Sequence, residues 1–77
     1  MRDLLHYLAC VLVDHPDDVK VDEEETPEGT LLRLHVRRED VGKVIGKQGR
    51  TARAIRNLVH ASAAQRQQRV IVQFADA

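Results

Sequence analysis

Two glycines and the basic residues around them form the part of this sequence best suited to binding an anion. Gly46 and Gly49 lie in the run V-I-G-K-Q-G, with Lys47 between them and Lys43 and Arg50 close by. Glycines at this spacing allow a tight turn whose backbone no side chain obstructs. The first N–H groups of a helix that follows such a turn lack partners and favour an anion. The run therefore predicts a turn against which a sugar–phosphate backbone can lie.

The common nucleotide-binding glycine motifs do not fit this run. A P-loop requires G-x-x-x-x-G-K and then Ser or Thr, whereas Gly42 and Gly46 are one residue too close together and glutamine follows Lys47. A dinucleotide-binding motif requires G-x-G-x-x-G after a strand, and the sequence meets neither condition. A structural alternative stays open, in which Gly46 caps one helix, Gly49 adopts a left-handed backbone and nothing binds.

The helix predicted after this turn gathers its basic side chains on one side. At about 100° per residue, one arc of roughly 120° holds Arg50, Arg53, Arg56, Asn57 and His60. The opposite side, expected to face a core, holds Ala52, Ile55, Val59, Ser62 and Ala63. Charged helical faces are commonly only solvated. This one adjoins a turn that accepts anions, and the combination favours binding to a polyanion.

No catalytic or metal-binding pattern accompanies these residues. The histidines are scattered, at His6, His15, His35 and His60, and show no close metal-ligand spacing. The acidic runs over 17–18 and 23–25 are expected to be solvated and to repel a polyanion from their side. No Ser–His–Asp or Cys–His arrangement can be built. We therefore expect no enzyme, no cofactor and no metal.

The charges cancel over the whole chain but not within its halves. The 77 residues contain 12 Lys and Arg against 12 Asp and Glu. Residues 1–30 hold nine acids and two bases, whereas residues 31–77 hold three acids and ten bases. Because the basic half contains the glycine run, this asymmetry indicates something about the partner. The composition is that of a folded globular chain, and the length predicts one domain over residues 1–77.

The first helix is predicted from apolar residues at helical spacing, at Leu4, Leu5, Leu8, Val11 and Leu12. It is expected to start near Asp3 and to end after Asp14, ahead of Pro16. The apolar run is too short to span a membrane and lacks the flanks of a signal peptide. A lone cysteine, Cys10, allows no internal disulfide, so we expect a soluble protein of the reducing cytoplasm.

A β-hairpin is predicted next. Val19 and Val21 alternate with polar residues, and we expect this strand to end in the acidic run 23–25. The sequence T-P-E-G over 26–29 is typical of a turn, since proline presets φ and glycine closes the loop. Alternation resumes over 30–37, and one face of that strand holds Leu32, Leu34 and Val36.

Two helices and a strand complete the predicted order. Glu39 and Asp40 suit the positive end of a short helix that Gly46 ends. A longer helix follows from about Arg50 to Ala64, and residues 70–74 alternate as a final strand. The order α-β-β-α-α-β predicts an α+β fold, in which three helices cover one face of a three-stranded sheet.

The stretch from Asp40 to Arg56, D-V-G-K-V-I-G-K-Q-G-R-T-A-R-A-I-R, resembles the core of a KH domain. The V-I-G-x-x-G signature between two helices is the specific part of this likeness, and the KH core would cover about residues 30–75. The predicted order is similar to the type II KH fold, and the whole chain resembles the KhpA (YlqC) family of small bacterial RNA-binding proteins. The resemblance implies single-stranded RNA binding in a groove that clamps about four nucleotides.

The resemblance and the charge pattern together name the expected RNA-binding residues: Lys43, Val44, Ile45, Gly46, Lys47, Gln48, Gly49, Arg50 and Arg53. By analogy the turn holds phosphates, Val44 and Ile45 form an apolar floor, and Leu34 or Val36 forms a far wall. Of the two aromatic residues, only Phe74 lies on a predicted strand. Recognition by stacking bases on aromatic platforms is therefore not expected. The expected role is that of an RNA chaperone or post-transcriptional regulator. A protein-interaction adaptor with a structural glycine corner and a single-stranded DNA binder are the alternatives.

The long helix also carries apolar residues outside its core-facing side. Ala54, Leu58 and Ala61 widen the apolar arc beyond what one sheet needs to cover. One explanation places Leu58 in the core of its own chain, and the other is a homodimer in which two helices meet around Leu58. The resemblance implies that KhpA-type proteins self-associate and pair with the larger RNA-binding protein KhpB. We predict a homodimer that uses this helix.

Overall fold

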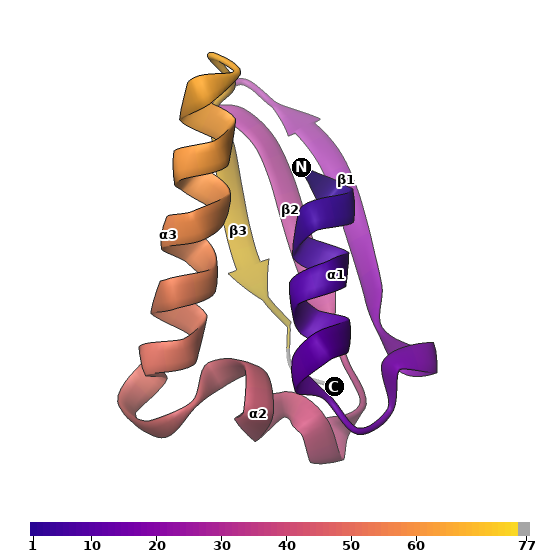
Figure 1. The fold of residues 1–77 in the computed structure, drawn as a ribbon. Helices are drawn as coiled ribbons and strands as arrows, with labels where there is room; N and C mark the ends of the chain where they lie inside the picture. The colour runs from indigo at the N-terminus through magenta and orange to yellow at the C-terminus, as the bar shows by residue number, and fades with distance from the viewer. Residues whose placement is uncertain (76–77) are drawn as a thin grey trace.

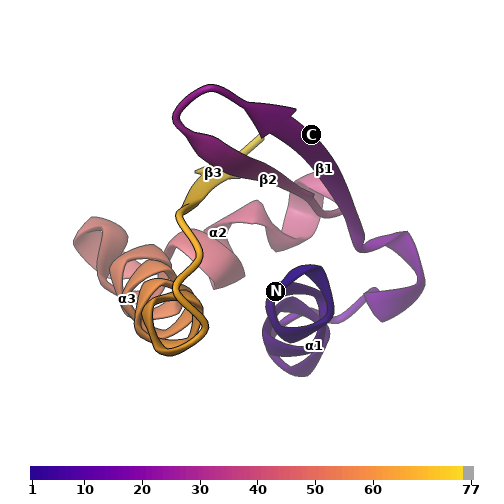
Figure 2. The same cartoon turned by 90° about the horizontal axis from the view of Figure 1, so that it is seen from above.

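A sheet of three strands with three helices on one face accounts for residues 1–75, the part of the chain that the computed structural model describes. Figure 1 shows the elements in the order α1-β1-β2-α2-α3-β3, and Figure 2 shows the helices together on one side of the sheet. The predicted α+β class and element order are confirmed. The predicted domain runs to residue 77, and its residues 76 and 77 lie outside the described residues.

The sheet is mixed. Strands β1 (Lys20–Thr26) and β2 (Gly29–His35) form an antiparallel hairpin, and β3 (Val70–Phe74) pairs in parallel with β2. The order β1-β2-β3 leaves β3 at one edge. The expected end of β1 at residues 23–25 is wrong, because the strand continues through them to Thr26. Their backbones pair fully with β2 while their carboxylates stay in solvent, so the strand needs no apolar residues there.

The core lies between the sheet and helices α1 (Arg2–Leu12), α2 (Val41–Ile45) and α3 (Arg50–Gln65). The sheet contributes alternate residues of β2 and β3, as the period of a strand requires. These include Leu32, Leu34, Val70 and Val72. The predicted inner side of the long helix is largely confirmed, since Ala52, Ile55, Val59 and Ala63 are buried. Ser62, at the margin of that side, is half-buried.

Helix α1 faces the core with part of its predicted apolar side, since Leu5 is buried and Leu4 and Leu8 pack against the core. Leu5, Ala9 and Val13 are buried, whereas Val11 is 65% exposed. The core-facing side of α1 thus passes through Ala9, and Val11 lies outside it. The helix ends at Leu12, two residues before the expected end. No helix within residues 1–75 combines the length and apolar character that crossing a membrane requires.

The end of α3 is closed by a left-handed residue that is not glycine. Gln67 has a φ of 57°, and its N–H donates to the carbonyl of Ala64 at 3.0 Å. The N–H of Gln68 donates to the carbonyl of Ala63 at 2.9 Å. These two bonds form a Schellman motif, in which glycine is the usual left-handed residue.

Replacing Gln67 by glycine is therefore expected to stabilise the fold. The left-handed backbone costs a residue with a Cβ about 1–2 kcal/mol, and part of this gain is lost to the more flexible unfolded chain. We expect Gln67→Gly to raise the unfolding free energy by roughly 0.5–1 kcal/mol, measured by urea denaturation. Gln65→Gly, inside the last helical turn, is the control and should lower the unfolding free energy by about 1 kcal/mol. A lower stability for Gln67→Gly would contradict this account.

Candidate nucleic-acid interface

The turn between α2 and α3 has the backbone that its glycines permit. Gly46 ends α2 with a φ of 76° and a ψ of 173°, and Gly49 precedes α3 with a φ of 73°. Between them, Gln48 is also left-handed, with a φ of 58°. A Cβ on Gly46 would collide with the side chain of Thr51 and come within 2.9 Å of its backbone nitrogen. Position 46 therefore accepts only glycine, whereas a Cβ on Gly49 would meet open space.

The N–H groups that this turn offers to an anion begin ahead of α3. The N–H of Gly49 donates to the carbonyl of Gly46 at 3.2 Å. The N–H of Arg50 donates to the carbonyl of Lys47, so the helical path already begins at Lys47. Because the first N–H groups of a helical segment have no carbonyl one turn earlier, those of Lys47 and Gln48 are available to an anion.

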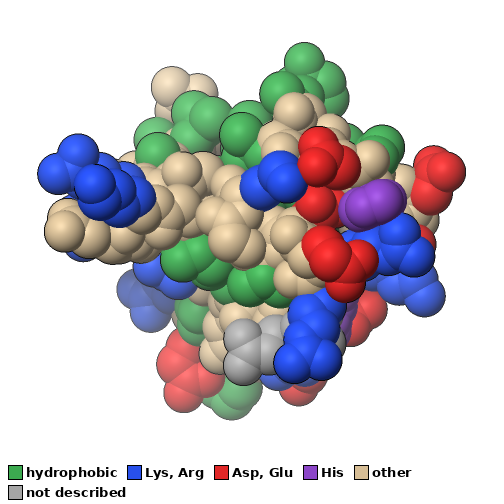
Figure 3. Space-filling model, turned by 90° about the horizontal axis from the view of Figure 1, so that it is seen from below, with side chains coloured by type: hydrophobic (Ala, Val, Ile, Leu, Met, Phe, Trp, Pro, Cys, Tyr) green, Lys and Arg blue, Asp and Glu red, His purple; other side chains and the backbone are tan. Residues whose placement is uncertain are grey.

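Three basic residues beside the turn are free to meet an anion. Lys47, Arg50 and Arg53 are exposed. Among residues 1–75, the Lys and Arg side chains that form ion pairs are Arg37 and Lys43. Figure 3 views this end of the molecule from below. Blue side chains stand alone on the α3 side, whereas on the other side they mix with Asp, Glu and His. The turn therefore carries positive charge that no carboxylate neutralises locally.

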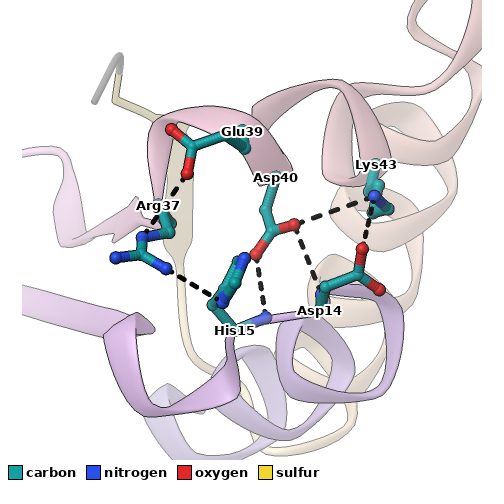
Figure 4. A network of polar contacts seen from close by, with 6 residues as sticks. All are labelled: Asp14, His15, Arg37, Glu39, Asp40 and Lys43. Carbon is teal, nitrogen blue, oxygen red and sulfur yellow. Dashed lines mark hydrogen bonds and ion pairs between the residues drawn. The ribbon is translucent and has the colours of Figure 1, made fainter.

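Lys43, a further predicted RNA-binding cation, is held by carboxylates. Its Nζ lies 2.9 Å from Oδ2 of Asp14 and 3.8 Å from Oδ1 of Asp40 (Figure 4). The hydrogen bond from Lys43 and its charge hold the pKa of Asp14 below the usual value, and the same contact raises the pKa of Lys43. Lys43 thus joins α2 to the end of α1, and it can reach an RNA only by leaving Asp14.

Asp40 is a buried carboxylate that fixes α2 against the segment after α1. It is 1% exposed, and its two oxygens accept the N–H groups of Asp14 at 3.3 Å and His15 at 3.0 Å (Figure 4). Arg37 extends the network to Glu39 at 3.5 Å and to Nδ1 of His15 at 3.1 Å. From the sequence, Asp40 is expected to complement the start of its own helix. Its carboxylate instead satisfies backbone groups 25 and 26 residues away.

The apolar residues assigned to the groove are mostly buried. Ile45 is half-buried and lies at the surface of the core. Val44 is 2% exposed, so it can support a floor only from beneath Ile45. Leu34 and Val36 are 1% and 6% exposed. Their expected role as a far wall is wrong, because both pack on the helix-covered face of the sheet and present no surface to a ligand.

The outer edge of β3 lies beside α3 and has free backbone groups. The N–H of Thr30 donates to the carbonyl of Arg69, and the N–H of Ala75 donates to the carbonyl of Leu34, both at 2.9 Å. In a parallel ladder, only alternate residues bond to the neighbouring strand. The register therefore turns the backbone groups of three residues to the open edge, namely Val70, Val72 and Phe74.

Arg56 covers part of this edge. Its guanidinium lies 5.3 Å from the centre of the Phe74 ring, and it donates to the carbonyl of Val72 at 3.5 Å. From the helical period Arg56 is expected on the exposed basic arc, but the residue is half-buried between α3 and β3. Phe74, the one aromatic residue on a described strand, is the sequence feature that could have indicated a partner for Arg56. No spacing rule connects it to a residue 18 positions earlier.

The apolar residues of α3 that lie outside its core-facing side are open to solvent. Ala54, Leu58 and Ala61 are exposed, and Leu58 is 49% exposed. The explanation that Leu58 belongs to the core of its own chain is therefore wrong. Helix α1 adds Tyr7 and Val11 to the exposed apolar residues of the helical layer. Small residues on both sides of Leu58 leave room for a second helix to approach.

Metal-ligating side chains do not gather in the described part of the chain. Residues 1–75 contain no group of three or more His, Cys, Asp or Glu that could hold a metal ion. Sγ of Cys10 lies 3.6 Å from Nδ1 of His6, one turn earlier on α1. This pair is remote from the α2–α3 turn in the sequence and lies on the other long helix.

Comparison with known proteins gives consistent matches. Residues 2–74 match the family described as "KhpA/KhpB, KH domain". The RNA-binding protein KhpA of Halalkalibacterium halodurans is 46% identical over 76 residues, which cover 99% of this chain and 100% of that protein. The RNA-binding protein KhpA of Bacillus subtilis is 49% identical over 76 residues, covering 99% and 94%. The protein of the same name from Listeria monocytogenes is 51% identical over 61 residues, covering 79% and 80%.

Proposed function

Because the chain belongs to the KhpA/KhpB family of KH domains, we propose that it binds single-stranded RNA. The observation that carries the proposal is the exposed turn from Gly46 to Gly49, whose free N–H groups and neighbouring basic side chains face solvent together. The sugar–phosphate backbone lies against this turn, where Lys47 and Arg50 balance its charge. Side chains larger than glycine at position 46 would displace the start of α3.

About four nucleotides fit the binding mode of such a domain. Their bases lie between Ile45 and the open edge of β3. Leu34 and Val36 do not form the second wall of this groove, because both are buried. The groove has aliphatic side chains and backbone groups where sheet-type RNA readers have aromatic platforms, so each domain binds weakly. Arg53 contacts a phosphate, whereas Lys43 contributes only when it leaves Asp14.

The role that follows is that of a non-enzymatic RNA chaperone or post-transcriptional regulator in the cytoplasm, with residues 1–77 acting as one domain and a KH core over about 30–75. The relatives are named RNA-binding proteins, which supports RNA as the ligand class. A protein-interaction adaptor and a single-stranded DNA binder are the outcomes against which the proposal is tested.

Salt dependence tests whether the turn binds a backbone. With roughly three phosphates contacted, the logarithm of the association constant should fall against the logarithm of salt concentration with a slope near −2, at about −0.7 per phosphate. Titration of a fluorescent single-stranded RNA at several salt concentrations measures the slope. The same RNA sequence made as DNA is the control for the sugar, and it should bind more weakly. A slope near zero would favour the adaptor, and equal affinity for the two strands would favour a nucleic-acid binder that does not sense the 2′-hydroxyl.

We also propose that the protein forms a homodimer through Ala54, Leu58 and Ala61, and that it pairs with KhpB. Linking two weak RNA sites raises affinity through effective concentration, without new contacts in either site. Leu58→Glu should give a folded monomer, because an exposed Leu58 contributes little to its own core and a carboxylate is costly in an apolar interface. Sedimentation equilibrium measures the state, and RNA affinity should fall with it. His60→Glu, an exposed change about 100° or more around α3 from each of these three residues, should remain dimeric. An unmodified protein that stays monomeric at high concentration would contradict the prediction.

A further inference from the structure

A small open pocket, with hydrogen-bonding groups beside apolar surface, lies at the far end of α3 from the α2–α3 turn. A cavity of about 190 Å³ is lined there by His60, Ala63, Gln68, Arg69 and Val70. At about 1.5 Å per residue, it lies about 20 Å along the helix from Arg50. The lining contains a cation, an imidazole and an amide, and no carboxylate. Its chemistry is suited to an anion with attached hydrogen-bonding groups.

The turn after α3 builds this site and fixes the backbone of Arg69. The Schellman motif at Gln67 brings Gln68 and Arg69 back toward the last turns of the helix. The carbonyl of Arg69 accepts the N–H of Thr30, which ties the residue to the start of β2. A Cβ on Gly29 would come within 2.9 Å of Cγ of Arg69, so the side-chain stem rests on the hairpin where glycine leaves room. The backbone and the Cβ–Cγ stem of Arg69 are therefore fixed, while the residue as a whole stays exposed.

A continuous line of binding groups joins this cavity to the α2–α3 turn. The free edge of β3 runs beside α3 between them, and Val70 turns its backbone N–H and carbonyl outward at the cavity end. Arg53 and His60 are exposed on the intervening side of the helix, and Arg56 lies over the edge at its middle. A strand that leaves the turn along this edge meets cationic or hydrogen-bonding groups at each step.

We propose that the cavity binds a further nucleotide of the same RNA strand, with its phosphate on Arg69 and its base against His60, Gln68 and the backbone of Val70. The proposal rests on RNA binding at the α2–α3 turn and lengthens the path beyond it. It assigns the RNA a footprint that runs along α3 and the edge of β3. Continuity with the turn favours RNA over an unrelated acidic ligand.

The test compares two lengths of single-stranded RNA of uniform sequence, about four and about eight nucleotides. The unmodified protein should bind the longer RNA at least tenfold more tightly. Arg69→Gln, which keeps the packed Cβ and Cγ, should weaken binding of the longer RNA about threefold to tenfold and leave the shorter one unchanged. Arg66→Gln removes an equal charge from the exposed end of α3 outside the cavity, and it should leave both affinities unchanged. His60→Gln is a second variant that should weaken binding of the longer RNA only. Because His60 is exposed, the protein should stay folded.

Each outcome separates the two levels of the proposal. A gain with length that is lost in Arg69→Gln and kept in Arg66→Gln supports the second site. Equal responses of the two variants would show that the gain comes from two protomers on one RNA, and would overturn it. No gain with length, while the shorter RNA still binds, also overturns the second site and leaves the proposed function standing. Failure of both RNAs to bind the unmodified protein would instead refute RNA binding itself.

Discussion

Replacing Lys47 and Gln48 together by aspartate should abolish RNA binding while the protein stays folded. Both side chains are exposed at the α2–α3 turn, so their loss removes no core contact. Two carboxylates would then stand where a phosphate approaches, beside the N–H groups proposed to bind it. The repulsion and the lost attraction amount to several kcal/mol if the contact is partly desolvated, which is a hundredfold or greater loss of affinity.

The control for this double variant changes the same amount of charge elsewhere. Gln65→Asp with Arg66→Asp also replaces one glutamine and one base by aspartate, at exposed positions at the other end of α3. Binding of an RNA of about four nucleotides should survive this change, because only charge near the turn is expected to matter at that length. Fluorescence anisotropy gives the affinities, and circular dichroism verifies folding. A folded Lys47→Asp, Gln48→Asp variant with undiminished affinity would refute the assignment of the turn.

Gly46→Ala should be the most destabilising single-methyl change in the turn. The new Cβ would collide with Thr51 and force the start of α3 away from α2. Its backbone, with a φ of 76° and a ψ of 173°, is also one that essentially only glycine adopts. Overpacking and backbone strain together should lower the unfolding free energy by about 3–5 kcal/mol, most of the stability of a domain this small.

Gly49→Ala provides the matched comparison. A Cβ at this position meets nothing within 4 Å, so only the left-handed φ of 73° is costly. We expect a loss of about 1–2 kcal/mol, measured for both variants as the shift of the urea unfolding midpoint. Equal losses of unfolding free energy for the two alanine variants would contradict this account. They would show that the contact between position 46 and Thr51 relaxes at no cost.

The elements that the sequence predicted well are those specified by local signals. Turns at Gly29 and Gly46 follow from residues that permit unusual backbone angles, and the long helix follows from a regular apolar period. The side of α1 that faces the core could not be read in the same way. Its apolar residues spread over a wide arc, and the choice of Ala9 over Val11 depends on how closely the sheet approaches. The predicted end of strand β1 came too early for a similar reason. Pairing with β2 extends the strand through the acidic run, and no local sequence pattern indicates that pairing.

The candidate site shows the same difference between local and long-range signals. The turn and its free cations were predicted from adjacent residues. The partners of Lys43 and Arg56 were not, because Asp14 and Phe74 lie 29 and 18 positions away and meet them only in the folded chain. Tertiary contacts thus decided which members of a basic sequence remain available to a ligand.

The separation of acidic and basic residues has a consequence for how an RNA approaches. The acidic hairpin and the α2–α3 turn lie toward opposite ends of a molecule whose longest dimension is 34 Å (Figure 1). At physiological ionic strength, electrostatic potentials decay over about 8 Å, so an anion near the turn is screened from the hairpin. The neutral chain therefore gives little attraction at long range, whereas the unpaired cations beside the turn attract a strand at short range and orient the turn toward it. Encounter rates should depend less on salt than those of a uniformly basic binder, while the orientation at first contact is already selected.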